Sequence, residues 1–266
     1  MSVYDQQTLK TTTELAAVAA FAYAGRDGAP RLIPVTPLLS GGVPAFTLTY
    51  ARSELAREIS ASRRAALVFA DSRLAYVGWN PLAVEARVEV FPDPQGEVFR
   101  ESLLHQELLK FPPARQFADS LVLQRENWWY LPRWILRVVE ASVPRPVSRR
   151  AGPDHGVLAY ERHDSLTAES VRVEDWDAAR IPVRARENLE PLPEDSPAAL
   201  LCHDFAIPDM DPRTTFLATG RLENGRLSVA GRNGSHTLGK RPGLLARWRA
   251  QRDLERRCKA GIAEHA

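Results

Sequence analysis

Residues 31–50 read RLIPVTPLLSGGVPAFTLTY, a pattern that predicts an antiparallel β-hairpin. The first half is an apolar run whose prolines are typical of an edge or bulged strand. Gly41 and Gly42 form the turn. In the returning half, the apolar Phe46 and Leu48 alternate with threonines, as they do in a strand with one buried face. The pattern therefore predicts a β-rich fold for this part of the chain.

The residues on either side of this hairpin extend the same pattern. An alanine-rich apolar segment precedes it, and Ser53 is placed to cap a helix that runs to about Ser62. Because strands and helices do not alternate regularly, the sheet is expected to be antiparallel. The predicted fold is mainly β with inserted helices (α+β), an antiparallel split β-barrel. Further strands are expected at 65–70, 82–90 and 134–139, and a further helix at 97–110.

The chain is expected to divide near residue 150 into two domains. Residues 1–150 form the split barrel, and residues 151–266 form a C-terminal domain. Within the second domain, residues 212–230 repeat the hairpin pattern, and a helix is expected at 244–259. This echo predicts a degenerate second half-barrel followed by a terminal helix. The alternative is an unrelated hairpin and a terminal helix.

The composition excludes several protein classes. In 266 residues, 44% are hydrophobic and 26% charged, as in globular proteins that bury a core. Twenty prolines argue against a continuous helical bundle. A net charge of +2 gives no overall field that favours nucleic acid or an anionic membrane. The two cysteines, Cys202 and Cys258, lack the spacing of a disulfide framework or a zinc site. No segment is apolar enough to span a bilayer. Together these observations predict a cytoplasmic location.

The stretch from Arg31 to Asp71 resembles the pyridoxamine 5′-phosphate oxidase-like, FMN-binding split-barrel superfamily. The likeness lies in the glycine hairpin, in Tyr50-Ala51-Arg52-Ser53, and in the helix and strand that follow. The segment 127–133, NWWYLPR, is similar to the region before the closing strand of some members. The resemblance covers roughly residues 10–140.

The resemblance implies a cofactor site at the junction between the second hairpin strand and the short helix. Arginine forks, hydroxyls and a helix N-terminus suit a phosphate dianion. Arg52, Ser53 and Arg57 are therefore the expected phosphate-binding residues. The expected neighbours of the flavin ring are Val35, Thr36 and Pro37 on one strand, Thr47 and Thr49 on the next, and Trp129 in the aromatic segment.

The implied function is flavin-dependent oxidation or reduction of a small molecule, in which FMN or a deazaflavin carries the hydride. The family often binds flavin between two subunits, so the expected partner is a second copy of the chain or an internal substitute supplied by residues 151–266. One position departs from the family, because Leu55 stands where a basic residue is usual. Leu55 favours the alternative, a non-enzymatic binding or interaction module that has lost the cofactor.

Three other features of the sequence are compatible with either a binding site or a purely structural role. The aromatic run Trp128-Trp129-Tyr130, with Arg125 and Arg133 nearby, suits either a planar ligand or core packing. Cys202-His203-Asp204 offers metal ligands, but neighbours on a strand point to opposite faces, so no metal site is predicted. The basic helix 240–259 is expected to be a solvated face, with phosphate-backbone contact to nucleic acid as the alternative.

Overall fold

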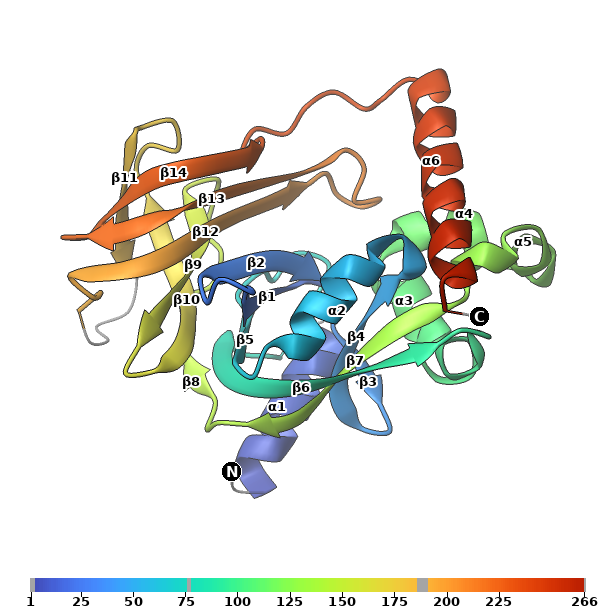
Figure 1. Cartoon of the computed structure of the whole chain (residues 1–266), viewed down its shortest axis with the longest axis horizontal. Helices are drawn as coiled ribbons and strands as arrows, with labels where there is room; N and C mark the ends of the chain where they lie inside the picture. Colours follow the sequence, from blue (N-terminus) through green and yellow to red (C-terminus); the bar gives the residue numbers. More distant parts are fainter. Residues whose placement is uncertain (1–2, 76–77, 186–190, 266) are drawn as a thin grey trace.

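The computed structural model describes residues 3–75, 78–185 and 191–265. It contains two antiparallel β-sheets with helices around the first, as the predicted α+β split-barrel fold requires (Figure 1). None of the helices in these ranges is long and apolar enough to cross a membrane.

The first sheet has the order β2-β1-β5-β6-β7-β4-β3, and β8 pairs with β6. Phe21, Phe46 and Leu136 form part of its core, to which helix α2 adds Ile59. The bounds of the strands are β1 (Ala19–Ala24), β2 (Pro30–Val35), β3 (Leu38–Ser40), β4 (Val43–Thr49), β5 (Ala65–Phe69), β6 (Leu82–Asp93), β7 (Arg133–Ala141) and β8 (Arg145–Pro146).

The predicted hairpin is only partly a hairpin. β3 pairs with β4 across the glycine turn, but β2 pairs with β1 at the other end of the sheet order. The apolar run 31–39 is thus two strands, with the break at Thr36 and Pro37. Proline has no N–H to donate to a strand ladder, which favours a break at this position. In β4, Phe46 and Leu48 are buried while Thr47 and Thr49 are half-buried, which confirms the predicted alternation.

Helices surround the first sheet. Helix α1 (Val3–Leu15), which the sequence patterns did not predict, contacts β3 and β4. The expected helix at 97–110 begins with a π-helical turn, η2, before α3. The remaining bounds are η1 (Tyr50–Arg52), α2 (Ser53–Ala61), η2 (Phe99–Leu103), α3 (Leu104–Lys110), η3 (Pro112–Ala114), α4 (Arg115–Ala118), α5 (Leu121–Glu126) and η4 (Trp128–Tyr130).

The C-terminal region exceeds the expected half-barrel, because its six strands close into a complete barrel of order β10-β11-β14-β13-β12-β9. The hairpin echo at 212–230 is β13 and β14, and the predicted terminal helix is α6 (Leu244–Ala263). The strands are β9 (His155–Arg162), β10 (Ser165–Val173), β11 (Arg180–Ala185), β12 (Asp195–Phe205), β13 (Arg213–Glu223) and β14 (Arg226–Gly234).

The two sheets pack against each other through small and branched apolar residues. Along β12, Ala198, Leu200 and Cys202 face the interior of the second barrel, while Ala199 and Leu201 join a shared core with β1, β2 and β5. Both faces of this strand are therefore buried. The division into domains at residue 150 stays a prediction.

Figure 1 shows that the chain after β14 crosses from the second barrel to the opposite side of the molecule. There α6 contacts η1 and η4. This path returns the C-terminus of the chain to the start of α2.

Candidate functional site

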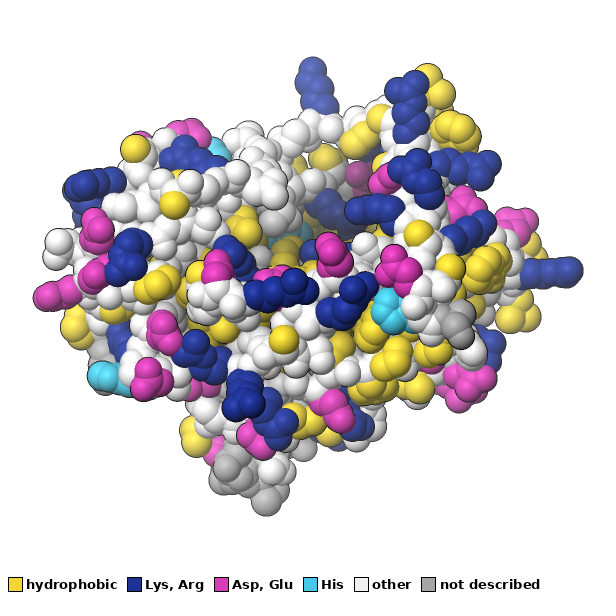
Figure 2. Space-filling view, in the orientation of Figure 1, with side chains coloured by type: hydrophobic (Ala, Val, Ile, Leu, Met, Phe, Trp, Pro, Cys, Tyr) yellow, Lys and Arg dark blue, Asp and Glu magenta, His cyan; other side chains and the backbone are white. Residues whose placement is uncertain are grey.

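A cavity of about 470 Å³ lies between the two barrels and the helices. Figure 2 shows this face of the molecule hollowed between the C-terminal barrel and α6, with Lys or Arg side chains gathered along the hollow. The cavity is lined by residues from β2, β4, η1, α3, η3, α4, η4, β7, β12 and β13, and by Leu254 of α6. Three parts of the chain that are distant in sequence thus meet at one site.

One side of the cavity, the N-terminal wall, contains five of the predicted site residues. The end of β2 contributes Val35, and Thr36 follows it. Thr47 and Thr49 belong to the half-buried face of β4. Arg52 is the last residue of η1, and its guanidinium has no hydrogen bond or ion pair among the described residues. An arginine fork without a counter-ion is thus available to an anion in the cavity.

Two of the other predicted phosphate ligands are held by their own contacts. The buried Ser53 hydroxyl donates to the carbonyl oxygen of Tyr50 (2.8 Å) and accepts from the indole N–H of Trp134 (3.0 Å). The prediction that Ser53 caps the short helix is therefore wrong: Ser53 is the first residue of α2, and the N-cap position belongs to Arg52. Arg57 is exposed and forms an ion pair with Glu264 (3.2 Å). Neither residue lines the cavity.

Pro37 and Trp129 also lie outside the cavity lining. Pro37 is buried, and its carbonyl oxygen accepts a hydrogen bond from the Lys110 ammonium (2.7 Å). Trp129 is buried in a core cluster, edge-to-face with Phe117 at 5.5 Å between ring centroids. The neighbouring Tyr130 lines the cavity in its place. The aromatic run therefore serves mainly as core packing.

A polar cluster around Glu107 forms another part of the lining. The Glu107 carboxylate accepts hydrogen bonds from Tyr130 (2.8 Å) and Thr47 (3.2 Å) and pairs with Arg133 (3.4 Å). Burial, together with the adjacent Glu107, raises the pKa of Tyr130 well above its ordinary value. The tyrosine therefore remains protonated and acts as a hydrogen-bond donor near neutral pH.

A further part of the cavity lining, the C-terminal wall, consists of His203, Met210, Arg213, Thr214 and Thr215. Sequence analysis did not assign a site to these residues. The alternation of β12 does indicate which face His203 occupies, because it places Cys202 inside the second barrel and His203 on the outer face of that barrel. Nothing local in the sequence indicates that this outer face meets the N-terminal half of the chain.

His203 is uncharged near neutral pH. Burial lowers its pKa to about 4. Its buried Nδ1 atom has no hydrogen-bond partner. Within the described residues, no group of three potential ligands is positioned to hold a metal ion.

No protein-family model and no curated protein matches the chain. Among solved structures, similarity extends to a heme binding protein from Mycobacterium smegmatis, with 15% identity over 98% of this chain and 99% of that one and a TM-score of 0.36. An F420 reductase is 22% identical over 50% of this chain and 94% of its own, with a TM-score of 0.35.

The Agrobacterium tumefaciens protein Atu2129, of unknown function, is 15% identical with a TM-score of 0.34. The match covers 53% of this chain and spans 56% of that protein's length. Membership of the flavin-binding superfamily stays a prediction.

Proposed function

We propose that the cavity binds FMN or a deazaflavin and that the protein is an oxidoreductase acting on a small molecule. The observation that carries this proposal is the unpaired guanidinium of Arg52 at the cavity, next to the polar face of β4. The volume of about 470 Å³ lies in the range of about 300–1,000 Å³ common to ligand sites. Arg52 matches the anionic group of the cofactor, and the edges of β2 and β4 at the cavity match its planar ring system.

The residues present fit such a cofactor. Arg52 would hold the phosphate by charge-assisted hydrogen bonds. Val35, Thr36, Thr47 and Thr49 would border the ring system. The bound cofactor supplies hydride transfer, and the protein supplies binding and orientation. Tyr130 donates its one O–H to Glu107, so at the cavity its phenol oxygen is fixed as a hydrogen-bond acceptor.

Leu55 does not weaken this proposal. It is half-buried, packs against the core of the first sheet and does not line the cavity. The cation at the cavity is supplied by Arg52 and not by position 55. The cofactor-free interaction module is retained as one outcome of the experiment below.

Titration of the purified chain with FMN, followed by quenching of flavin fluorescence, tests the proposal. We expect saturation, and we expect Arg52→Gln to weaken FMN affinity by about tenfold to a hundredfold, the usual effect of losing a hydrogen bond to a charged group. The matched control is Arg57→Gln, whose arginine is paired with Glu264 outside the cavity. Absence of saturation with FMN and with a deazaflavin would favour the interaction module.

We also propose a second candidate ligand, protohaem, on one specific observation. The cavity lining contains a neutral imidazole, His203, together with the Met210 thioether, and both are established types of haem iron ligand. Arg52 and Arg213 would then pair with the two propionates. Titration with haemin distinguishes the candidates, because His203→Ala should abolish a Soret shift caused by histidine ligation and leave FMN binding intact.

A further inference from the structure

The outer face of the β12–β13 hairpin presents a second group of binding residues to the cavity. His203 is directly opposite Thr215 in the antiparallel register. Side chains of directly paired residues lie on the same face, and residues two apart on a strand share a face. Arg213 therefore lies on the same face as Thr215 and His203. All three residues line the cavity.

Arg213 is available to an anion. Its guanidinium carbon lies 4.8 Å from the centroid of the Phe111 ring, and the guanidinium has no hydrogen bond or ion pair among the described residues. The nearby Asp211 carboxylate is instead bonded to Nε of Arg241 (2.8 Å). Contact with Phe111 restricts the arginine while leaving its N–H donors free.

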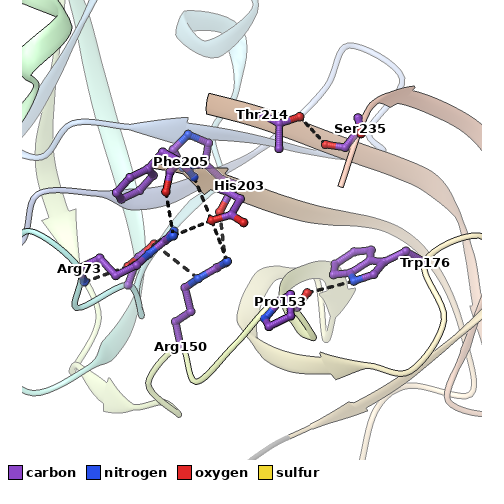
Figure 3. A network of polar contacts seen from close by, with 10 residues as sticks. Arg73, Arg150, Pro153, Trp176, His203, Phe205, Thr214 and Ser235 are labelled. Atoms are coloured by element: carbon purple, nitrogen blue, oxygen red, sulfur yellow. Dashed lines mark hydrogen bonds and ion pairs between the residues drawn. The ribbon is translucent and has the colours of Figure 1, made fainter. Parts of the chain in front are cut away.

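The two adjacent threonines differ in availability. The Thr214 hydroxyl donates to the carbonyl oxygen of Ser235 at 2.6 Å (Figure 3). The Thr215 hydroxyl has no partner in the described part of the chain. Thr215, and not Thr214, is therefore free to bond a ligand.

We propose that the C-terminal wall binds the substrate and that the substrate carries a carboxylate. Arg213 binds the carboxylate through its planar fork, and the Thr215 hydroxyl donates a further hydrogen bond. His203 is the hydrogen-bond partner of a hydroxyl or carbonyl group next to that carboxylate. The inference rests on the proposed function, in which Arg52 and the N-terminal wall hold the cofactor.

Two arguments separate this anion site from the phosphate site. Arg52 belongs to η1 of the first half of the chain and Arg213 to β13 of the second, so different parts of the fold bring the two cations to one cavity. A planar guanidinium fork binds carboxylate and phosphate alike, so the preference for a carboxylate rests on the charge around Arg213. The neutral imidazole of His203 adds no charge to that of Arg213, so the C-terminal wall is matched to a singly charged group.

The test uses benzoate as a simple carboxylate probe, with benzamide as its neutral counterpart and phenyl phosphate as the competing anion. Binding is measured by calorimetry on the cofactor-free full chain and by the flavin difference spectrum of the FMN-loaded chain. We expect benzoate to bind at least tenfold more tightly than benzamide and more tightly than phenyl phosphate. In the FMN-loaded chain, where the cofactor phosphate occupies Arg52, tighter binding of phenyl phosphate than of benzoate would overturn the carboxylate assignment.

Variants then locate the site. Arg213→Gln should lower benzoate affinity at least tenfold and change FMN affinity less than twofold. Arg52→Gln should lower FMN affinity at least tenfold and change benzoate affinity less than twofold. Arg213→Lys keeps the positive charge without the planar fork and should give an intermediate loss of benzoate affinity. The same variant replaces Arg213→Gln in the test if Arg213→Gln fails to fold. Thr215→Val should weaken benzoate several-fold, whereas Thr214→Val, its matched control, should not.

The two proposals fail in different ways. If FMN binds but benzoate does not, or if both Arg213 variants bind benzoate as the unaltered chain does, the substrate site is refuted and the cofactor site stands. If FMN does not bind, the cofactor proposal fails, and calorimetry on the cofactor-free chain still reports whether Arg213 selects a carboxylate.

Discussion

Glu107 is the residue on which the polar side of the cavity depends. Its carboxylate binds Thr47, Tyr130 and Arg133, and it is the counter-charge of an arginine that is 1% exposed. The Arg133 guanidinium lies between the rings of Phe99 (4.0 Å) and Tyr130 (4.1 Å). The ion pair and the ring contacts together fix an arginine that would otherwise be a buried charge.

We expect Glu107→Gln to lower the free energy of unfolding by about 3 kcal/mol, because removing one partner of a buried ion pair leaves the other uncompensated. Urea denaturation followed by circular dichroism measures this change. The control is Glu140→Gln, which breaks the exposed pair with Arg87 and should cost less than about 1 kcal/mol. Equal losses in the two variants would contradict the role assigned to Glu107.

His203 should make the protein less stable in mild acid. Its pKa is lowered from 6.5 to about 4 in the folded chain, so between these values the unfolded state binds more protons. Stability is therefore fully present above pH 6.5 and falls as the pH drops toward 4, by at most about 1.4 kcal/mol per pH unit. Urea denaturation gives the free energy of unfolding at pH 7 and pH 5. The difference between the two pH values should be smaller for His203→Gln than for the unaltered chain, while a variant of an exposed histidine, His105→Gln, should show the same difference as the unaltered chain.

At the scale of elements, helix α6 depends on a close approach of backbone to backbone. A Cβ atom at Gly261 would lie 2.3 Å from the carbonyl oxygen of Tyr50. Cys258 is buried in the same contact, and Leu254 extends to the cavity. The C-terminal part of this helix is therefore fitted to η1, the turn that carries Arg52.

Gly261→Ala should displace α6 and lower the thermal unfolding temperature. The gain of about 1 kcal/mol in helix propensity is smaller than the cost of about 1–3 kcal/mol for forcing a methyl group into a packed contact. FMN affinity should fall in the same variant because the helix supports η1. Gly239→Ala, where nothing lies within 4 Å, is the control, and an unchanged melting temperature for Gly261→Ala would disprove the contact.

At the scale of the whole molecule, four charged side chains join the two sheets (Figure 3). Asp71 and Arg73 follow β5, Arg150 lies between β8 and β9, and Asp204 belongs to β12. Asp204 pairs with Arg73 (2.5 Å) and with Arg150 (3.2 Å), and Asp71 also pairs with Arg73 (2.7 Å). The cluster lies beside the apolar contact between the barrels and adds charge complementarity to it.

Asp204→Asn should lower the free energy of unfolding by about 1–3 kcal/mol, because two largely buried arginines lose a shared acceptor charge. Asp195→Asn breaks an exposed pair with Arg221 and should change stability by less than about 1 kcal/mol. Urea denaturation of both variants gives the comparison. A loss for Asp204→Asn no larger than for the control would show that the apolar contact alone holds the barrels together.

The sequence by itself determined the local elements. Strand alternation and glycine turns depend on residues a few positions apart, so the strand of Phe46 and Leu48, the helix starting at Ser53 and the terminal helix were predicted. The break of the run 31–39 into β2 and β3 was missed, because an apolar run does not specify which neighbour it pairs with. The first four strands of the C-terminal barrel, β9 to β12, were missed as well. Most of the N-terminal wall, from Val35 to Arg52, was also predicted, because it follows directly from that local order.

Only the tertiary structure decided which of these residues share a cavity. Ser53, Arg57 and Trp129 have the chemistry of ligand-binding residues, but packing commits each of them to a protein partner. Arg213 and His203 reach the cavity because the outer face of β12 and β13 packs on a sheet formed more than 100 residues earlier, a contact that the local pattern of these strands does not indicate. Long-range packing is set by the fit of whole surfaces, which no short stretch of sequence contains.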